Sequence, residues 1–374
     1  MTLPLSAEKT ASAASNKLAT EPALLSISNL HLGYGSTCVL QNVNLVLEKG
    51  EIGCVLGPSG SGKTSLLRAI AGFLPLQNGE IYIYEQCVSS ATKTLAPKQR
   101  SVGVVFQDFA LFPHMTVAEN IAFGLAKLDA QTRKQRVNEY MKITGIGAFE
   151  NVYPAELSGG QQQRVAIARA IAPQPDLLLM DEAFSSLDPS LREQIAQDIR
   201  RIIKSLGLTA ILVTHDQTEA FSFADKIAVV ANQQLQQYSS AYDLYHEPET
   251  YFVANFIGEG AFINGVVNIA ANKAQVNTAL GVFTLQAKQV QQLDLVHQQT
   301  IRVLLRPDDL IHDDASPTKT LIEETNFRGA YIRYQLRIQS SQEKVLCFAP
   351  SHHNHKVGEH FGVRANVEHV ICFP

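Results

Sequence analysis

The fold of this chain is decided by the stretch Glu51-Ile-Gly-Cys-Val-Leu-Gly-Pro-Ser-Gly-Ser-Gly-Lys-Thr64. The apolar run Ile52–Leu56 predicts a buried strand that ends at Gly57. Residues 57–64 match the pattern Gly-x-x-x-x-Gly-Lys-Ser/Thr, and the helical composition of Ser65–Ile70 follows directly. The strand, the loop and the helix together predict a phosphate-binding loop in an α/β domain.

The spacing in this loop suits a nucleotide, because glycines let successive backbone N–H groups face one anion at a helix N-terminus. Lys63 is expected to reach the β- and γ-phosphates, and the Thr64 hydroxyl to ligate Mg²⁺. A glycine-rich turn can match such a pattern by accident, but the strand before it and the helix after it favour nucleotide binding. The residues expected to bind are Gly57, Pro58, Ser59, Gly60, Ser61, Gly62, Lys63, Thr64 and Ser65.

Length and composition favour a soluble protein of two domains. The chain has 374 residues, of which 45% are hydrophobic and 18% charged. The net charge of −4 gives no reason to expect nucleic acid or an anionic membrane as a partner. Apolar runs such as Ile227–Ala231 are strand-sized, far short of a membrane span.

Two further compositional features concern the compartment. The five cysteines are scattered and odd in number, which favours a reducing cytoplasm. Residues 1–22 are rich in Ser, Ala and Thr and lack an apolar core, so we expect a disordered tail and no signal peptide.

A tyrosine lies ahead of the phosphate loop. Residues 24–47 predict two paired strands that flank the turn-rich segment Gly33–Ser36. Tyr34 in this segment is a candidate for stacking on adenine, since a flat ring costs little entropy to order. The alternative is an exposed hairpin tyrosine without a ligand.

Between residues 108 and 165 the pattern becomes helical and predicts a helical subdomain inserted into the α/β domain. Thr116 and Glu119 form a capping-box pattern, and a helix from Gln131 to Thr144 is expected to end at Gly145. The sequence Ser158-Gly-Gly then opens another helix, which predicts a second anion site. The alternative is a capped helix with no ligand.

Two apolar strands deliver polar side chains at their ends. Leu177–Met180 is followed by Asp181 and Glu182, which suit Mg²⁺ binding and polarisation of an attacking water respectively. The alternative is a pair of solvated carboxylates. The run from Ala210 to Thr214 ends at His215, which is either structural or a γ-phosphate contact.

Taken in order, these motifs resemble those of the ATP-binding cassette (ABC) family over residues 24 to about 258. The resemblance identifies Gly57–Thr64 as Walker A, Gln107 as the Q-loop, Leu157–Gln161 as the signature motif, Leu177–Asp181 as Walker B, Ser185–Asp188 as the D-loop and His215 as the switch histidine. Tyr34 falls at the adenine-stacking position of the family. Ala183 departs from the pattern, because many relatives carry proline there.

The resemblance implies roles for these residues. Glu182, His215 and Gln107 would be catalytic, and Mg²⁺ would be held by Thr64, Gln107 and Asp181. ATP would be bound between two chains arranged head to tail, and the second chain would supply Ser158, Gly159, Gly160, Gln161 and Asp188. The implied protein is the ATPase subunit of a bacterial importer at the cytoplasmic face of the inner membrane, with a membrane permease and, indirectly, a periplasmic solute-binding protein as partners.

A finer resemblance is to ferric-iron importers. It rests on the segment from Gln107 to Asn120, on the three glutamines after Gly160 and on Phe256–Gly260. Importers of polyamines, sugars, sulfate or molybdate are the alternatives for the solute. A soluble ABC ATPase acting on DNA or ribosomes is disfavoured, because such proteins usually carry two cassettes or long coiled coils. A protein that only binds nucleotide is disfavoured by the presence of Glu182.

Residues 259–374 change character. Clean alternation in Ile332–Gln339, with further strand patterns at Ile301–Leu305 and Val276–Leu285, predicts a half-buried sheet without long helices. The domain resembles the small all-β barrel, OB-like and TOBE-type, appended to many importer ATPases. Histidines at positions 352, 353 and 355 match no firm metal-ligand spacing, and the segment is expected to be a loop.

Overall fold

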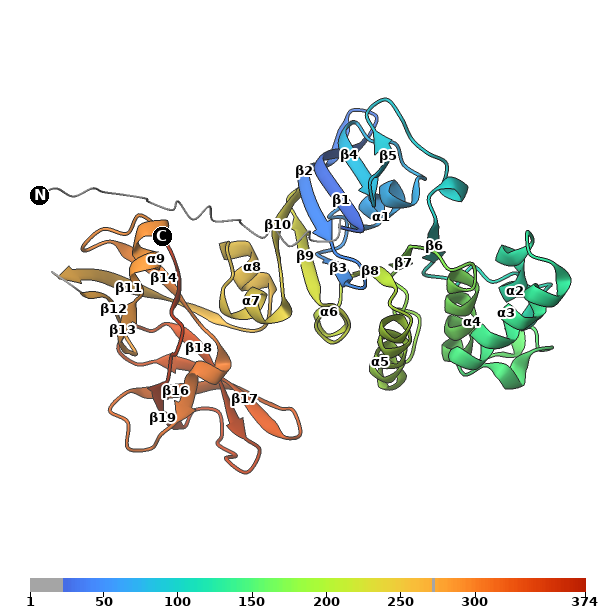
Figure 1. The fold of residues 1–374 in the computed structure, drawn as a ribbon. Helices are drawn as coiled ribbons and strands as arrows, with labels where there is room; N and C mark the ends of the chain where they lie inside the picture. Colours follow the sequence, from blue (N-terminus) through green and yellow to red (C-terminus); the bar gives the residue numbers. More distant parts are fainter. Residues whose placement is uncertain (1–22, 271–272) are drawn as a thin grey trace, which may run out of the picture.

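The computed structural model describes residues 23–270 and 273–374 (Figure 1). The expected tail over residues 1–22 lies outside the described residues. Figure 1 shows the α/β region in the centre, a helical region on one side of it and a β-barrel on the other. This arrangement matches the fold class predicted from the sequence.

The central sheet carries the phosphate-binding loop. Its strands, in the order β10-β9-β3-β8-β7-β6, are β10 (Gln234–Ser239), β9 (Lys226–Ala231), β3 (Ile52–Leu56), β8 (Thr209–Thr214), β7 (Leu177–Asp181) and β6 (Val102–Val105). All but β10 pair in parallel, and the inner strands are buried along their length, as the continuous apolar runs predicted. The carboxyl ends of β3, β7 and β8 therefore meet at one edge.

Three helices pack on this sheet, namely α1 (Lys63–Ala71), α5 (Pro189–Ser205) and α6 (Gln217–Phe223). Helix α1 begins at the end of the glycine-rich loop and buries Leu66, Leu67 and Ile70. Asp216 caps α6 by accepting hydrogen bonds from the backbone N–H groups of Thr218 and Glu219.

A second, antiparallel sheet covers α1. Its order is β2-β1-β4-β5, with β1 (Leu25–Tyr34), β2 (Thr37–Leu47), β4 (Asn78–Ile83) and β5 (Gln86–Ser90). The predicted pairing of β1 with β2 is confirmed, but the turn is tighter than expected. Gly33 and Tyr34 belong to β1, and Tyr34 pairs with Thr37, so only Gly35 and Ser36 form the turn.

The helical region contains α2 (Val117–Ala122), α3 (Ala130–Ile143) and α4 (Gly159–Ile171), with short 3₁₀ turns at 123–125, 147–149 and 154–156; another such turn, at 97–99, precedes β6. The predicted capping box is present, because Thr116 Oγ1 accepts from the N–H of Glu119 and Glu119 accepts from that of Thr116. Helix α3 buries Val137, Tyr140 and Met141, the face that the periodicity predicted.

The C-terminal region follows α7 (Ala241–His246) and α8 (Tyr251–Phe256). One five-stranded sheet consists of β13 (Gly281–Leu285), β12 (Lys273–Thr278), β11 (Ala261–Ala270), β14 (Thr300–Leu305) and β20 (Ile371–Phe373). The other consists of β15 (Leu310–His312), β19 (His360–Ala365), β16 (Lys319–Phe327), β17 (Tyr331–Ile338) and β18 (Lys344–Pro350). Both sheets contribute to one apolar core and form a nearly closed, OB-like barrel.

The barrel confirms one sequence prediction and corrects another. Burial alternates along β17, as the pattern in Ile332–Gln339 predicted. The single strand expected over Val276–Leu285 is instead two strands, β12 and β13, which pair antiparallel through a turn at Ala279–Leu280. A short helix, α9 (Ala287–Gln292), follows this hairpin and was not foreseen.

Arg306 fastens the barrel to the α/β region. Its guanidinium lies 4.3 Å from the ring centre of Tyr245 in α7 and donates to the Tyr245 carbonyl oxygen at 3.2 Å. The Tyr245 hydroxyl in turn donates to Asp308 at 3.1 Å, and burial raises the pKa of this hydroxyl. These contacts fix the start of the second barrel sheet against the α/β region.

Candidate functional site

The glycine-rich loop between β3 and α1 is built to hold an anion. Gly57 packs so closely on β9 that a Cβ there would lie 2.1 Å from the carbonyl oxygen of Val230. Gly62, the N-cap of α1, has φ +100°, which favours glycine. Ser61 Oγ is buried without a hydrogen-bond partner, and a phosphate oxygen would satisfy it. These features fit the nucleotide predicted from the sequence.

Lys63 places its charge inside this loop. The side chain is 6% exposed, and Nζ donates to the carbonyl oxygens of Gly57 and Pro58, each at 2.9 Å. Burial lowers the pKa of Lys63, while the carboxylates of Glu182 and Asp181 oppose this shift. The ammonium group therefore lies inside the loop, where the charges of the two carboxylates at the end of β7 favour its protonated form.

Thr64 and Asp181 come together from α1 and β7. Thr64 Oγ1 donates to Asp181 Oδ1 at 3.2 Å, and burial raises the Asp181 pKa against this hydrogen bond. A hydroxyl and a carboxylate at one point are the oxygen donors that Mg²⁺ prefers. The residues present therefore fit the predicted ion.

Glu182 and His215 face each other across the ends of β7 and β8. The Glu182 backbone has φ +45° and its N–H donates to the Val213 carbonyl oxygen at 2.9 Å, so the chain turns sharply there. This turn holds Glu182 Oε1 3.2 Å from His215 Nδ1. The Glu182 side chain is mostly buried, while the His215 side chain is half exposed. His215 is therefore open to a substrate, and the Glu182 carboxylate holds its ring.

Tyr34 lies beside the start of α1. Its ring is 50% exposed, and its hydroxyl is 3.3 Å from Ser65 Oγ. The exposed ring therefore lies next to the phosphate-binding loop, where the predicted stacking on adenine requires it. That role stays a prediction.

The Ser158 segment forms a complete capping box at the start of α4. Ser158 Oγ accepts from the N–H of Gln161, and the Gln161 side chain accepts from that of Ser158. Gly160 lies against Ile195 of α5. In the part of the chain that the structure describes, no hydrogen bond or ion pair joins residues 158–161 to residues 57–65. No direct polar contact therefore joins the two predicted anion sites within the described residues.

Comparisons with known proteins agree with this geometry. A sequence profile of the ABC transporter family matches residues 40–185, and a TOBE domain profile matches residues 303–373. The spermidine/putrescine import ATP-binding protein PotA of Oleidesulfovibrio alaskensis is 39% identical over 83% of this chain and 84% of its own length. The chain belongs to the ABC transporter ATPase family.

Other relatives are named for the import of different solutes. The Fe(3+) ions import ATP-binding protein FbpC 2 of Haemophilus influenzae is 39% identical over 86% of this chain and 90% of its own. The sulfate/thiosulfate import ATP-binding protein CysA 2 of Chromobacterium violaceum is 38% identical over 86% of both. Among solved structures, cbiO1 of Clostridium perfringens, part of the ABC transporter complex cbiONQ, is 29% identical with a TM-score of 0.57, covering 61% of this chain and 93% of that one.

Within this ABC ATPase, two predicted residues lie at the margin of the site. Gln107 follows β6, the strand beside β7, but its side chain is exposed and makes no hydrogen bond to Thr64 or Asp181 among the described residues. Asp188 is the N-cap of α5 and makes no side-chain capping bond. Their assigned roles in Mg²⁺ binding and in the second half-site stay predictions.

Sequence reasoning missed one link in the site. Ser186 Oγ donates to the carbonyl oxygen of Gln107 at 3.1 Å, which joins the segment after β7 to the segment after β6. The adjacency of β6 and β7 could not be derived from either motif alone. The only local signal was the position of Ser186 inside the predicted D-loop.

Proposed function

We propose that this ABC ATPase is the ATP-hydrolysing subunit of an importer that carries ferric iron through a separate membrane permease. The observation that carries the hydrolytic role is the pair of contacts at one sheet edge, Thr64 with Asp181 and Glu182 with His215. Together they supply oxygen ligands for a metal and a carboxylate for a water, beside a phosphate-binding loop.

Each residue has a distinct part in hydrolysis. Thr64 and Asp181 would hold Mg²⁺, which would supply positive charge beside the phosphates of the nucleotide. Lys63 adds a fixed positive charge, which matters most where charge develops in the transition state. Glu182 accepts a hydrogen bond from the attacking water and polarises it. His215, held by Glu182, contacts the γ-phosphate.

The complete site needs two chains. The Ser158 helix start offers free N–H groups to an anion, yet among the described residues no hydrogen bond or ion pair joins it to the phosphate-binding loop. A head-to-tail homodimer places Ser158, Gly160 and Asp188 of one subunit over the nucleotide of the other. ATP then closes the dimer, and hydrolysis reopens it.

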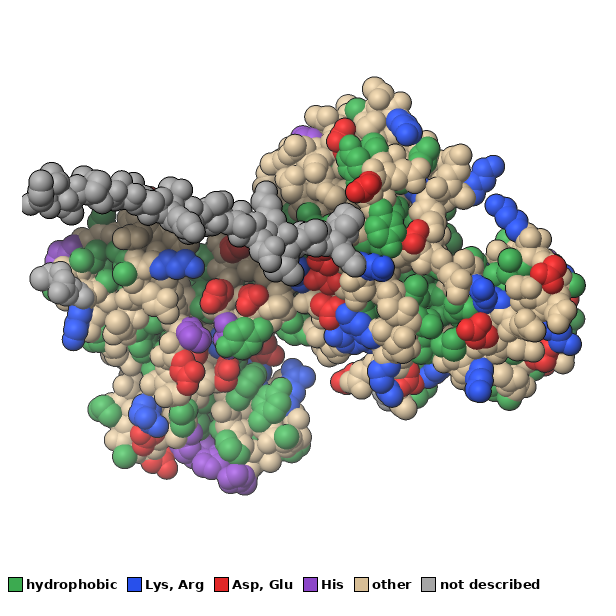
Figure 2. Space-filling model, viewed as in Figure 1, with side chains coloured by type: hydrophobic (Ala, Val, Ile, Leu, Met, Phe, Trp, Pro, Cys, Tyr) green, Lys and Arg blue, Asp and Glu red, His purple; other side chains and the backbone are tan. Residues whose placement is uncertain are grey.

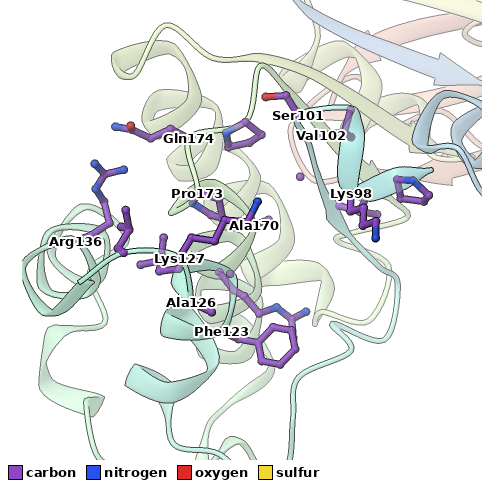
Figure 3. Close-up of a pocket in the computed structure, with 18 of the residues that line it drawn as sticks. Lys98, Ser101, Val102, Phe123, Ala126, Lys127, Arg136, Ala170, Pro173 and Gln174 are labelled. Atoms are coloured by element: carbon purple, nitrogen blue, oxygen red, sulfur yellow. The ribbon is translucent and has the colours of Figure 1, made fainter. Parts of the chain in front are cut away.

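A cavity of about 1190 Å³ between the helical region and β6 is the docking groove that we propose for the permease. In Figure 3, Phe123, Lys127 and Arg136 lie on the helical side of the cavity, and Lys98 and Val102 lie on the other. The groove exposes Phe123, which is 56% exposed and packs against Phe112, with ring centres 4.4 Å apart. An aromatic, partly basic groove suits an amphipathic helix.

The groove is connected to the nucleotide site through the chain. Gln107 follows Phe106, which lines the cavity, and it receives the hydrogen bond from Ser186. Arg169 of α4 holds the next part of this segment by donating to the carbonyl oxygens of Phe109 and Ala110. A movement of the helical region on ATP binding would therefore displace the groove wall.

In the described residues, we find no helix that is both long and apolar enough to cross a membrane. The transport path in our proposal belongs to the permease, and this chain binds at the cytoplasmic face of the inner membrane. The permease and a periplasmic solute-binding protein complete the proposed importer.

Ferric iron as the solute is supported by the resemblance of Gln107–Asn120 and Phe256–Gly260 to ferric-iron importers and by the iron importer relative from Haemophilus influenzae. Polyamine transport is the second candidate, because a relative named for spermidine and putrescine import is equally identical at 39%. Overall identity does not separate the two, since an ATPase subunit contacts the permease and not the solute.

Deletion of the protein is expected to impair growth on chelated ferric iron as the sole iron source, with polyamine and carbon-source use unaffected. The wild-type copy should restore growth and the Glu182→Gln copy should not, because transport needs hydrolysis. The measurement is uptake of radiolabelled ferric iron and of labelled spermidine. Equal iron uptake by deletion and parent strains, with no redundant importer expressed, would remove the iron assignment; loss of spermidine uptake instead would support the second candidate.

A further inference from the structure

Three histidines converge at one end of the C-terminal barrel. His312 ends β15, while His353 and His355 lie in the loop between β18 and β19. One ring nitrogen from each lies within 4.8 Å of the other two, and the Nδ1 atoms of His312 and His353 are 3.0 Å apart. Figure 2 shows histidine side chains gathered at the lower end of the barrel. His352, considered from the sequence, is not part of this cluster.

A carboxylate orients one of the three rings by a hydrogen bond, and a second carboxylate lies near another ring. His312 Nε2 is 3.1 Å from Asp314 Oδ1, and His355 Nδ1 is 3.6 Å from Glu359 Oε2. A carboxylate that accepts a hydrogen bond from the N–H of one ring nitrogen leaves the lone pair of the other nitrogen free for a metal. His312 Nδ1, the atom facing His353, is therefore the free lone pair of its ring. Two such nitrogens at 3.0 Å need a proton or a cation between them.

The cluster is held in place by packed aromatic side chains. The His312 ring stacks on Phe361 with centres 4.2 Å apart, and His355 meets the same ring edge-on at 5.1 Å. Tyr334 is fully buried, and its hydroxyl accepts from the N–H of His355 at 3.0 Å and donates to the carbonyl oxygen of His353. The Tyr334 hydroxyl thus fixes the backbone of the loop without using the imidazole rings. The contacts with Phe361 orient the rings of His312 and His355 before any ion binds.

We propose that His312, His353 and His355 bind one divalent transition-metal ion, with a fourth position open to water. Imidazole nitrogens favour ions such as Zn²⁺, Ni²⁺, Cu²⁺ and Fe²⁺, whereas Mg²⁺ prefers oxygen ligands. In a metal site with bonds of about 2.0–2.1 Å, the ligating nitrogens lie within about 4.2 Å of one another. The ring nitrogens of this cluster, all within 4.8 Å of one another, are already close to that separation. The nearby thiol of Cys347 donates instead to the Leu310 carbonyl oxygen at 3.2 Å, which leaves a purely imidazole site.

This site is separate from the proposed importer function. It stands on residues of the barrel, and none of them belongs to the nucleotide site. Excess Mg²⁺ competes for oxygen ligands, while an imidazole site prefers the added transition-metal ion. Zinc binding and ATP hydrolysis can therefore be measured independently on one protein.

The test is a calorimetric titration of the purified, chelator-treated full chain with Zn²⁺ in the presence of excess Mg²⁺ and without nucleotide, because nucleotide phosphates also bind Zn²⁺. We expect one Zn²⁺ per chain. His353→Gln and His355→Gln should each weaken Zn²⁺ binding at least tenfold, and Asp314→Asn should weaken it roughly 10- to 100-fold through loss of ring orientation. The matched control is His360→Gln, because His360 lies in the same sheet and bonds Gln339 instead of the cluster. Its affinity for Zn²⁺ should equal that of the unmodified chain.

His355→Gln is the decisive variant, because His355 is partly exposed and its loss leaves the stacking of His312 on Phe361 intact. Circular dichroism melting without metal should show that this variant folds, and its ATPase rate without zinc should equal that of the unmodified chain. Absence of stoichiometric Zn²⁺ binding, or undiminished binding in folded His355→Gln, would overturn the proposal. Neither result would touch the proposed ATPase function, which is measured by hydrolysis.

Discussion

Glu182→Gln is expected to stop ATP hydrolysis while leaving ATP binding intact. The substitution keeps the shape of the side chain and its place beside His215, but an amide cannot accept the proton of the attacking water. General-base catalysis contributes about 10²- to 10⁴-fold to rate, so turnover should fall by that factor. The measurement is phosphate release from Mg²⁺-ATP by the purified protein, together with equilibrium binding of a fluorescent ATP analogue.

The matched control for this substitution is Glu85→Gln, an exposed carboxylate in the turn between β4 and β5. It should hydrolyse ATP at the unmodified rate. If Glu182→Gln also hydrolyses at that rate, then the catalytic carboxylate has been assigned to the wrong residue.

Lys63→Ala is expected to weaken ATP binding itself. Its ammonium group is buried among the carbonyl oxygens of the loop, where its charge-assisted bonds to phosphate meet little competition from water. Hydrogen bonds to charged groups contribute about 1.5–3 kcal/mol each, so the loss of one or two predicts an affinity at least roughly tenfold lower. The same nucleotide-binding measurement gives the result directly.

The two substitutions are expected to separate ATP binding from ATP hydrolysis. Lys63→Ala should bind ATP poorly, whereas Glu182→Gln should bind it well and hydrolyse it slowly. Lys49→Ala, which removes an exposed lysine ahead of β3, should change neither property. Unchanged ATP affinity in Lys63→Ala would show that the loop binds phosphate without this charge.

Most of the α/β region could be predicted because its signals are local. The buried strands β3, β7 and β8 are largely apolar runs; β3 leads into the glycine-rich loop, and β7 and β8 end at or just before the polar residues that the site uses. The capping box at Thr116 and the buried face of α3 are likewise encoded within a few residues.

The features that escaped prediction depend on contacts between distant parts of the chain. The hairpin of β12 and β13 was interpreted as one strand, because Ala279 and Leu280 continue the apolar pattern and neither is a turn-forming residue. His312 could not be linked to His353, 41 positions away, until the pairing of β15 with β19 was known. The link between Ser186 and Gln107 likewise depends on the adjacency of β6 and β7.

The solute could not be derived for a different reason. The residues of this chain bind nucleotide and, in our proposal, the permease, so the solute leaves no direct trace in the sequence. The relatives accordingly carry iron, polyamine and sulfate names at nearly equal identity.

The most direct test of the central claim, that two chains complete each ATP site, is nucleotide-dependent cross-linking. The two substitutions are Ser59→Cys in the phosphate-binding loop and Ala155→Cys ahead of the Ser158 cap. Both positions are exposed, and neither substitution removes Ser158. In a Glu182→Gln background with the five native cysteines replaced by serine, a short thiol-reactive cross-linker should join the two positions between subunits with Mg²⁺-ATP, and not with ADP or when only one of the two introduced cysteines is present. A cross-linking yield between them that does not change when ATP is added would contradict the composite site.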